Sequence, residues 1–148
     1  MQIRELLYEE LEEASLLLWK SFYEAEKKSC SMAGMELFRD LTSPVSLSMN
    51  TCDGKNVLYG VFEKKTMVAV GLLQEKRKIV MLYVHPDSWR QGYGSHLLEF
   101  MECACDSDEI VLNASDFAVD FYEKHGYEKT APRKNENELY VTPMKKKK

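Results

Sequence analysis

The spacing of apolar residues predicts two helices in the first third of the chain. After a short strand expected at residues 3–6, apolar side chains recur every three or four positions between residues 7 and 25, as they do on the buried face of an amphipathic helix. A second, shorter helix is expected around the apolar residues 37–41. It is expected to end before Thr42-Ser43-Pro44, because a proline disfavours a helical residue in front of it.

The helical spacing of apolar residues is lost from residue 57 onward. Three segments, residues 57–63, 66–73 and 78–85, are rich in β-branched and aromatic side chains and are separated by short charged breaks. Three consecutive strands joined by tight connections predict an antiparallel meander. The first connection is Lys64-Lys65, which lacks the glycine or asparagine that a two-residue turn prefers, so the pattern does not settle the register of that hairpin.

Helices and strands alternate in the rest of the chain. We expect a helix over residues 92–101, a strand over 110–114, a second helix for which Ser115 is an N-cap candidate, and a closing pair of strands over 127–130 and 138–142. The resulting order is β-α-α-β-β-β-α-β-α-β-β. The sequence therefore predicts an α+β fold with one mixed, mostly antiparallel central sheet flanked by helices.

The 148 residues are expected to form one domain, residues 1–144, followed by a short tail. Residues 145–148 are all lysine and are expected to be solvated. Without them the chain has 16 basic and 24 acidic residues, against 20 and 24 for the whole chain. Such an acidic body argues against nucleic-acid binding, which needs a basic surface, and suits a cationic partner such as an amine.

Membranes and metal ions are not expected partners. No apolar run comes near the ~18 residues that cross a bilayer, and the acidic amino-terminal stretch is unlike a signal peptide, so a cytoplasmic location is expected. The four cysteines follow no secreted spacing and are expected to be free thiols. Cys103 and Cys105 form a C-x-C, but no nearby histidine completes a zinc site, and no metal site is predicted.

The segment from residue 79 to residue 98 carries the clearest chemical signal. A buried strand leads into a glycine-containing turn that opens a helix, and the first amide N–H groups of a helix lack intrahelical partners. Gly92 and Gly94 would let a phosphate approach this backbone, and Arg90 could add a charged contact. G-x-G also fits a plain turn. A dinucleotide fingerprint is absent, since Leu97 stands at its third glycine position.

Two motifs at the right distance from each other resemble the GNAT superfamily of acetyl-CoA-dependent N-acetyltransferases, and the resemblance spans nearly the whole chain. The first motif is W-R-Q-G-Y-G at residues 89–94, which follows L-Y-V-H-P and is similar to the family signature [RQ]-x-x-G-x-[GA], with Trp89 in place of Arg or Gln. The second is V-L-N-A-S-D-F-A-V-D-F-Y-E-K-H-G-Y at residues 111–127. The closing V-T-P-M at residues 141–144 resembles small bacterial members of undefined acceptor.

The resemblance implies acetyl-CoA as the cofactor and a V-shaped opening between the fourth and fifth strands that admits its pantetheine arm. Backbone groups of the fourth strand would pair with the arm, and amides of the glycine-containing turn would hold the pyrophosphate. The residues that the resemblance assigns to the cofactor are Leu82, Tyr83, Val84, Arg90, Gln91, Gly92, Tyr93, Gly94, Ser95, Asn113 and Ser115. For Ser115 the helix-capping role is an equal alternative.

For catalysis the resemblance points to Tyr122, because a phenol keeps its proton at neutral pH and can give it to a departing thiolate. The alternative for Tyr122 is a packing role in the core. The base that deprotonates the amine stays open among His85, Glu24, Glu26 and Glu63.

The resemblance implies an enzyme, an acyltransferase that moves the acetyl group of acetyl-CoA to a primary amine of a small molecule or a peptide. The alternative is a non-catalytic acyl-CoA-binding sensor or interaction module that keeps the opening and lacks the chemistry. The first two helices, which carry the aromatic residues Trp19 and Phe38, would wall the amine side. The acceptor and the oligomeric state stay open, a homodimer being one possibility.

Overall fold

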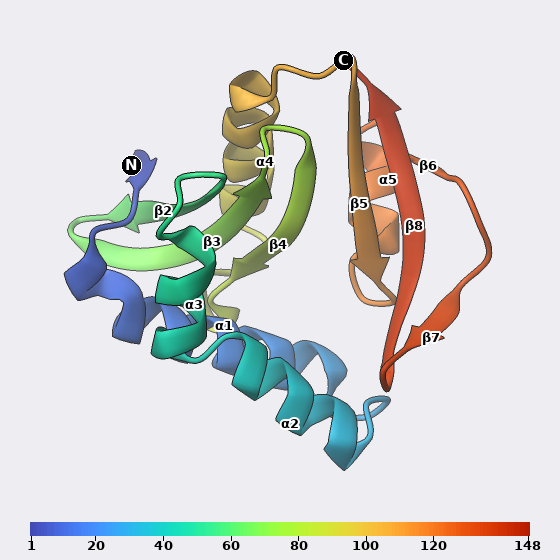
Figure 1. Ribbon diagram of the computed structural model, residues 1–148, viewed down its shortest axis with the longest axis horizontal. Helices are drawn as coiled ribbons and strands as arrows, with labels where there is room; N and C mark the ends of the chain where they lie inside the picture. Colours follow the sequence, from blue (N-terminus) through green and yellow to red (C-terminus); the bar gives the residue numbers. More distant parts are fainter.

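The computed structural model describes residues 1–148 and contains one central sheet with helices on both sides (Figure 1). The strands are β1 (Gln2–Glu5), β2 (Asn56–Glu63), β3 (Thr66–Gln74), β4 (Lys78–Val84), β5 (Glu109–Ser115), β6 (Glu128–Lys129), β7 (Lys134–Glu136) and β8 (Leu139–Lys147). The helices are α1 (Leu11–Glu26), α2 (Met32–Leu41), α3 (Pro44–Thr51), α4 (Tyr93–Ala104) and α5 (Val119–Lys124), with short 3-10 helices η1 (Tyr8–Glu10) and η2 (Pro86–Ser88). None of the helices combines the length and the apolar character that a membrane span requires.

The sheet has the strand order β1-β2-β3-β4-β5-β8-β6, and β7 pairs with β8. Neighbouring strands are antiparallel except β4 and β5, which are parallel. The predicted α+β fold with a mixed, mostly antiparallel sheet is therefore confirmed. The order of elements differs from the prediction by one additional helix, α3, and one additional short strand, β7.

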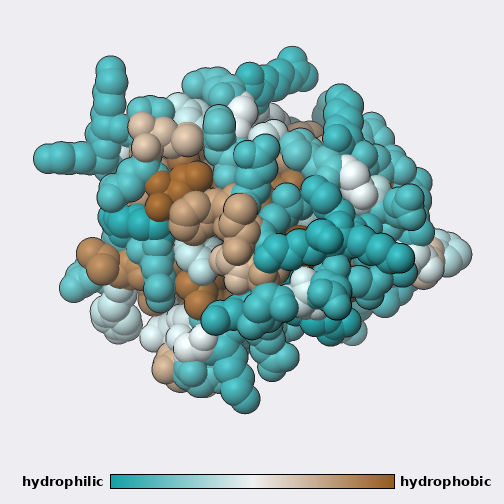
Figure 2. Space-filling view, turned by 90° about the horizontal axis from the view of Figure 1, so that it is seen from above, coloured by the Kyte–Doolittle hydropathy of each residue, from teal (hydrophilic) through white to brown (hydrophobic).

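Two apolar clusters cover the two faces of the sheet. Helices α1, α2 and α3 bring Leu18, Phe38 and Leu47 to one face, and α4 brings Leu97 and Met101 to the other. Strand β3 contributes to both clusters, which explains why it is apolar throughout instead of alternating. Figure 2 shows the molecule from above relative to Figure 1. This face is largely hydrophilic, and most of its apolar side chains gather in one area.

The hairpin between β2 and β3 forms without a glycine or asparagine. Lys64 and Lys65 have φ angles of 50° and 68°, which is the left-handed backbone that a two-residue hairpin turn requires. Glu63 pairs directly with Thr66, so the register that the sequence left open is set by this turn, followed by a β-bulge next to Val61.

Helix α3 begins where the sequence pattern predicts only a helix end. Ser43 acts as its N-cap, since its Oγ accepts a hydrogen bond from the Ser46 N–H at 3.2 Å. Pro44 occupies the first helical position, where a missing N–H leaves no helical bond unmade. Ser43 and Pro44 therefore separate two consecutive helices.

Two expectations about the C-terminal half are wrong. Ser115 is not an N-cap, because it is the last residue of β5 and α5 begins at Val119 without a side-chain cap. Residues 145–147 are not a tail, because they form the end of β8 and pair with residues 109–111 of β5. The charge of this stretch is partly neutralised by acidic neighbours, since Lys145 Nζ lies 3.2 Å from the carboxylate of Glu109.

Candidate active site

Strands β4 and β5 pair at only two positions and then diverge. Their parallel ladder joins Lys78 to Val111 and Ile79 to Leu112. Beyond these pairs a cavity of about 420 Å³ lies between the two strands, where Figure 1 shows the sheet parting. The V-shaped opening expected between the fourth and fifth strands is therefore present.

The cavity wall brings together most of the predicted site residues. It is built from β4, the turn before α4, β5, α5 and α1. The predicted residues that line it are Leu82, Tyr83, Val84, Arg90, Gly92, Tyr93, Gly94, Ser95, Asn113, Ser115 and Tyr122. Gln91 is the exception, because it is exposed and its Nε2 lies 3.5 Å from the Asp87 carbonyl oxygen, outside the wall.

Alternate backbone groups of β4 face the opening. Hydrogen-bonded and non-hydrogen-bonded positions alternate along an antiparallel pair. The His85 N–H donates to the Val68 C=O at 2.8 Å, so the polar backbone groups of Leu82 and Val84, at the other positions of the ladder, point away from β3. Because β5 has diverged, these groups are available to an extended ligand that lies along β4.

The side chain of Trp89 is hydrogen-bonded to one of these backbone groups. Its indole N–H donates to the Val84 C=O at 2.7 Å. Its ring centroid lies 5.1 Å from that of Phe117, in the loop between β5 and α5, and both rings line the cavity. The side chain that departs from the family signature therefore links the two sides of the opening.

A row of unpaired amides lies at the start of α4. The first helical hydrogen bond runs from the His96 N–H to the Gly92 C=O at 3.1 Å, and no backbone carbonyl accepts from the N–H groups of residues 90–95. Arg90 and Gly92 have φ angles of 64° and 87°, a backbone that turns successive N–H groups toward one side and forms an anion-binding concavity. A left-handed Arg90 is strained, as residues at functional sites often are.

His125 supports this turn from the end of α5, a contact that the sequence does not predict. Its Nδ1 lies 2.8 Å from the Phe121 carbonyl oxygen and its Nε2 lies 3.0 Å from Ser95 Oγ. A carbonyl only accepts, so Nδ1 carries the proton, and in the neutral ring Nε2 accepts from the Ser95 hydroxyl. The sequence offers only one signal for this contact, the position of His125 within the second family motif.

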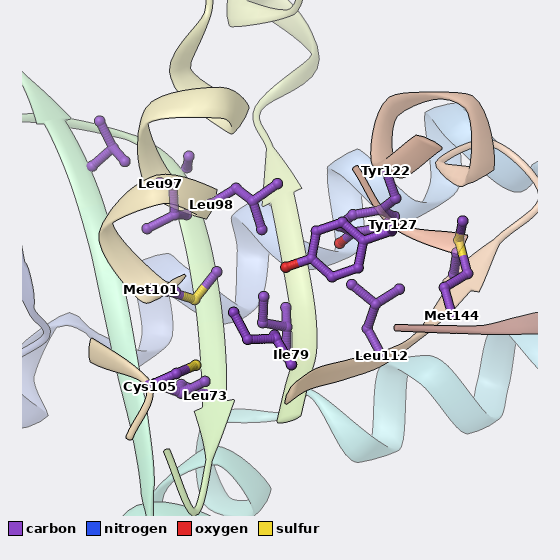
Figure 3. Packing of buried hydrophobic residues seen from close by; sticks show 14 of the residues in the cluster. Leu73, Ile79, Leu97, Leu98, Met101, Cys105, Leu112, Tyr122, Tyr127 and Met144 are labelled. Carbon is purple, nitrogen blue, oxygen red and sulfur yellow. The ribbon is translucent and has the colours of Figure 1, made fainter. Parts of the chain in front are cut away.

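Tyr122 lines the cavity and also packs in the core. Its ring centroid lies 5.2 Å from that of Phe121 and 5.5 Å from that of Tyr127, and the residue is 5% exposed. Figure 3 shows Tyr122 and Tyr127 among the core residues, near Ile79 and Leu112. Burial raises the pKa of Tyr122 above its ordinary value, so its hydroxyl is protonated at neutral pH.

The four candidate bases differ in their surroundings. His85 caps the start of η2. Glu63 accepts a hydrogen bond from the Tyr93 hydroxyl at 3.0 Å, and Glu24 is exposed on α1. Glu26, the last residue of α1, is buried.

Residues 26–148 match the family described as the acetyltransferase (GNAT) domain. The chain belongs to the GNAT family. The protein is accordingly an acyltransferase of the N-acetyltransferase type, and its cofactor is acetyl-CoA. A comparison with curated proteins gave no match.

Solved structures of other GNAT proteins share the fold. A GCN5-related N-acetyltransferase from Rhodopseudomonas palustris is 21% identical with a TM-score of 0.85, over 99% of this chain and 95% of that chain. PaiA N-acetyltransferase from Thermoplasma acidophilum, in complex with coenzyme A, is 20% identical with a TM-score of 0.80, over 99% and 98%. A variant of spermidine N-acetyltransferase from Vibrio cholerae is 16% identical with a TM-score of 0.67, over 99% and 95%.

Proposed function

We propose that this GNAT protein transfers the acetyl group of acetyl-CoA to a primary amine of a small molecule or a peptide, and that both reactants meet in the opening between β4 and β5. One observation carries the proposal. The turn with unpaired amides at residues 90–95 and the buried hydroxyl-bearing Tyr122 lie on the wall of the same cavity. An anion-binding turn and a proton donor in one cavity are what the cleavage of a diphosphate-bearing thioester requires.

The residues on the wall fit this cofactor. The N–H groups of residues 90–95 and the Arg90 guanidinium would hold the diphosphate. The backbone groups of Leu82 and Val84 that point away from β3 would pair with the amides of the pantetheine arm, which would displace the Trp89 indole N–H from the Val84 C=O. Asn113 and Ser115 would contact the arm from β5. When bound, acetyl-CoA supplies the thioester carbonyl carbon that an amine can attack.

Tyr122 would act as the general acid. Its hydroxyl would give its proton to the departing sulfur, and burial, which raises its pKa, keeps that proton in place until it is needed. A backbone N–H near Leu82, which faces the opening, would stabilise the negative charge that develops on the carbonyl oxygen.

A cationic acceptor suits the charge of this protein. The chain has 24 acidic against 20 basic residues. One solved structure with the same fold is named for spermidine, a polycationic amine. Charge attraction would raise the encounter rate with such an amine.

The proposal is tested by measuring the release of free coenzyme A thiol from acetyl-CoA. The panel should contain spermidine, a lysine-containing peptide and a small monoamine, each against a reaction without amine. We expect amine-dependent thiol release with at least one member. Saturable binding of acetyl-CoA without thiol release from any member would favour the alternative, a non-catalytic acyl-CoA sensor.

Trp89 provides an optical test of the cofactor position. The chain has two tryptophans, so the variant Trp19→Phe reports on Trp89 alone. We expect its fluorescence to change on titration with coenzyme A, because the pantetheine arm would compete with the indole N–H for the Val84 C=O.

The matched control is the variant Trp89→Phe, which leaves only Trp19. The Trp19 ring packs 5.0 Å from the guanidinium carbon of Arg39, at the interface of α1 and α2, and does not line the cavity. Its fluorescence should stay unchanged. A Trp89 signal that stays constant at saturating coenzyme A would contradict the placement of the arm along the end of β4.

A further inference from the structure

Glu26 is a buried carboxylate, and one of its two oxygens has no hydrogen-bond partner. The residue is 9% exposed at the end of α1. Its Oε2 accepts a hydrogen bond from Ser29 Oγ at 3.3 Å, whereas its Oε1 is buried without any hydrogen-bond partner. Burying a carboxylate oxygen without a hydrogen-bond partner destabilises the folded protein, so folding stability does not explain why a glutamate occupies this position.

No basic side chain neutralises Glu26. The adjacent Lys27 forms its ion pair with Glu24, at 3.1 Å. Arg133, which comes near from the segment before β7, is held by two of its nitrogens on the carboxylate of Asp116 at 2.8 to 3.0 Å. Because these two cations are bound to other carboxylates, neither forms an ion pair with Glu26.

Glu26 lies directly behind the wall of the active-site cavity, next to residues that line it, and is not itself a lining residue. Its chain neighbour Ala25 lines the cavity from α1, and so does Ser115 from β5. Burial raises the pKa of the Glu26 carboxyl, whereas nearby Ser29 and Ser115 and the Phe117 N–H lower it to a smaller extent. The carboxylate thus sits where the end of α1 meets the end of β5, beside the divergent strands.

We propose that Glu26 receives the ammonium group of the acceptor amine and takes its proton. This inference rests on the proposed function. It assigns Glu26 to the acceptor site, as the carboxylate that selects primary amines in their cationic form. An ammonium N–H of the substrate would then donate the hydrogen bond that Oε1 lacks within the protein.

The protons balance in this scheme. The ammonium loses one proton to Glu26, its nitrogen forms a bond to the thioester carbonyl carbon, and the carbon–sulfur bond breaks. The nitrogen loses a second proton as the amide forms, and that proton returns to solvent. The departing sulfur receives a proton from Tyr122, which is restored from solvent, as Glu26 releases its own proton when the amide leaves.

Four titratable groups from four parts of the chain lie near Glu26. Cys30 follows it in the loop after α1, Tyr83 faces it from β4, Asp116 from the loop after β5, and Arg133 from the segment before β7. Only Arg133 carries a positive charge, and that charge is shared with Asp116.

The variant Glu26→Gln keeps the shape and removes the charge. We expect kcat/KM for the amine to fall about 10²-fold or more at pH 7, the usual size of a general-base contribution. The loss should shrink as the pH rises toward 9.5, because the fraction of neutral amine in solution grows about tenfold per pH unit. A residue with only a structural role would give a loss that does not depend on pH. The matched control, Glu13→Gln at an exposed position of the same helix, should keep the wild-type profile.

Stability provides an independent measurement. Burial raises the pKa of Glu26 above its ordinary value of 4.5, so the folded protein binds this proton more tightly than the unfolded chain does. The contribution of Glu26 to stability is therefore present below pH 4.5 and is lost as the pH rises through the folded pKa. Glu26→Gln should raise the melting temperature at pH 8, whereas at pH 4 the variant and the wild type should melt alike.

Binding of butylamine to the coenzyme A-loaded protein, measured by calorimetry, separates the outcomes. Binding that Glu26→Gln abolishes and Glu13→Gln preserves supports the inference. This holds even if no amine in the panel is acetylated, in which case only the proposed function fails. Equal binding by wild type and Glu26→Gln, or a pH-independent kinetic loss, overturns the inference while the proposed function stands. No binding by the wild type overturns it as well.

Discussion

Replacement of Tyr122 by Phe is expected to lower kcat about 10²-fold or more, with little change in acetyl-CoA affinity. The ring would keep its contacts with Phe121 and Tyr127 because the substitution removes only the hydroxyl. The departing sulfur would then lack its proton donor, an interaction made as the bond breaks and not in the bound ground state. The measurement is steady-state thiol release with the best amine of the panel, at a pH where chemistry limits the rate.

The matched control removes a neighbouring phenol hydroxyl that does not line the cavity. Tyr127 donates a hydrogen bond to Glu102 Oε2 at 2.7 Å. Tyr127→Phe should reduce the free energy of unfolding by about 1 to 3 kcal/mol, because a carboxylate oxygen loses a partner, and should leave kcat near the wild-type value. Full turnover by Tyr122→Phe, or an equal loss of kcat in both variants, would remove the general-acid role from Tyr122.

Gly92→Glu should weaken coenzyme A binding about 10²-fold or more. The substitution brings a negative charge to the row of unpaired amides at residues 90–95. It also forces an L side chain into a φ angle of 87°. Loss of two charge-assisted hydrogen bonds to a diphosphate is worth about 3 kcal/mol, which is more than about 10² in affinity.

Gly54→Glu is the control for backbone strain. Gly54 lies in the turn between α3 and β2, has a φ angle of 78°, and no atom lies within 4 Å of the position that its Cβ would take. Both variants should lose a similar amount of stability, about 1 to 2 kcal/mol. Only Gly92→Glu should lose affinity in a titration of coenzyme A. Wild-type affinity in that variant would exclude the turn as the diphosphate site.

The sheet was predictable where the apolar pattern has a single interpretation. Three segments rich in β-branched and aromatic residues within residues 57–85 predict three strands, and they form β2, β3 and β4. Helix α4 likewise follows from the apolar spacing after Gly92. Helix α3 is different, because Pro44 ends one helix and starts the next, and the sequence alone gives equal support to a break and to a new N-terminus.

The sequence predicted the part of the candidate site that consists of consecutive backbone amides. The motif at residues 89–94 places its amides together because they are consecutive in the chain. Contacts between distant segments were not predictable: Trp89 bonded to the Val84 carbonyl, His125 on Ser95, and Glu26 beside Ser115 depend on how the elements pack. Periodicity in one sequence carries no information on such pairs.

The lysines at the end of β8 have a consequence for handling the protein. They look dispensable in the sequence, yet residues 145–147 are the pairing partners of Glu109, Ile110 and Val111. Strand β5 has little support on its other edge, where it meets β4 at two positions only. Removing the lysines would expose the backbone edge of β5 at residues 109–111, and an exposed strand edge can pair with a strand of another molecule. The positively charged end of β8 therefore also protects the protein from aggregation through this edge.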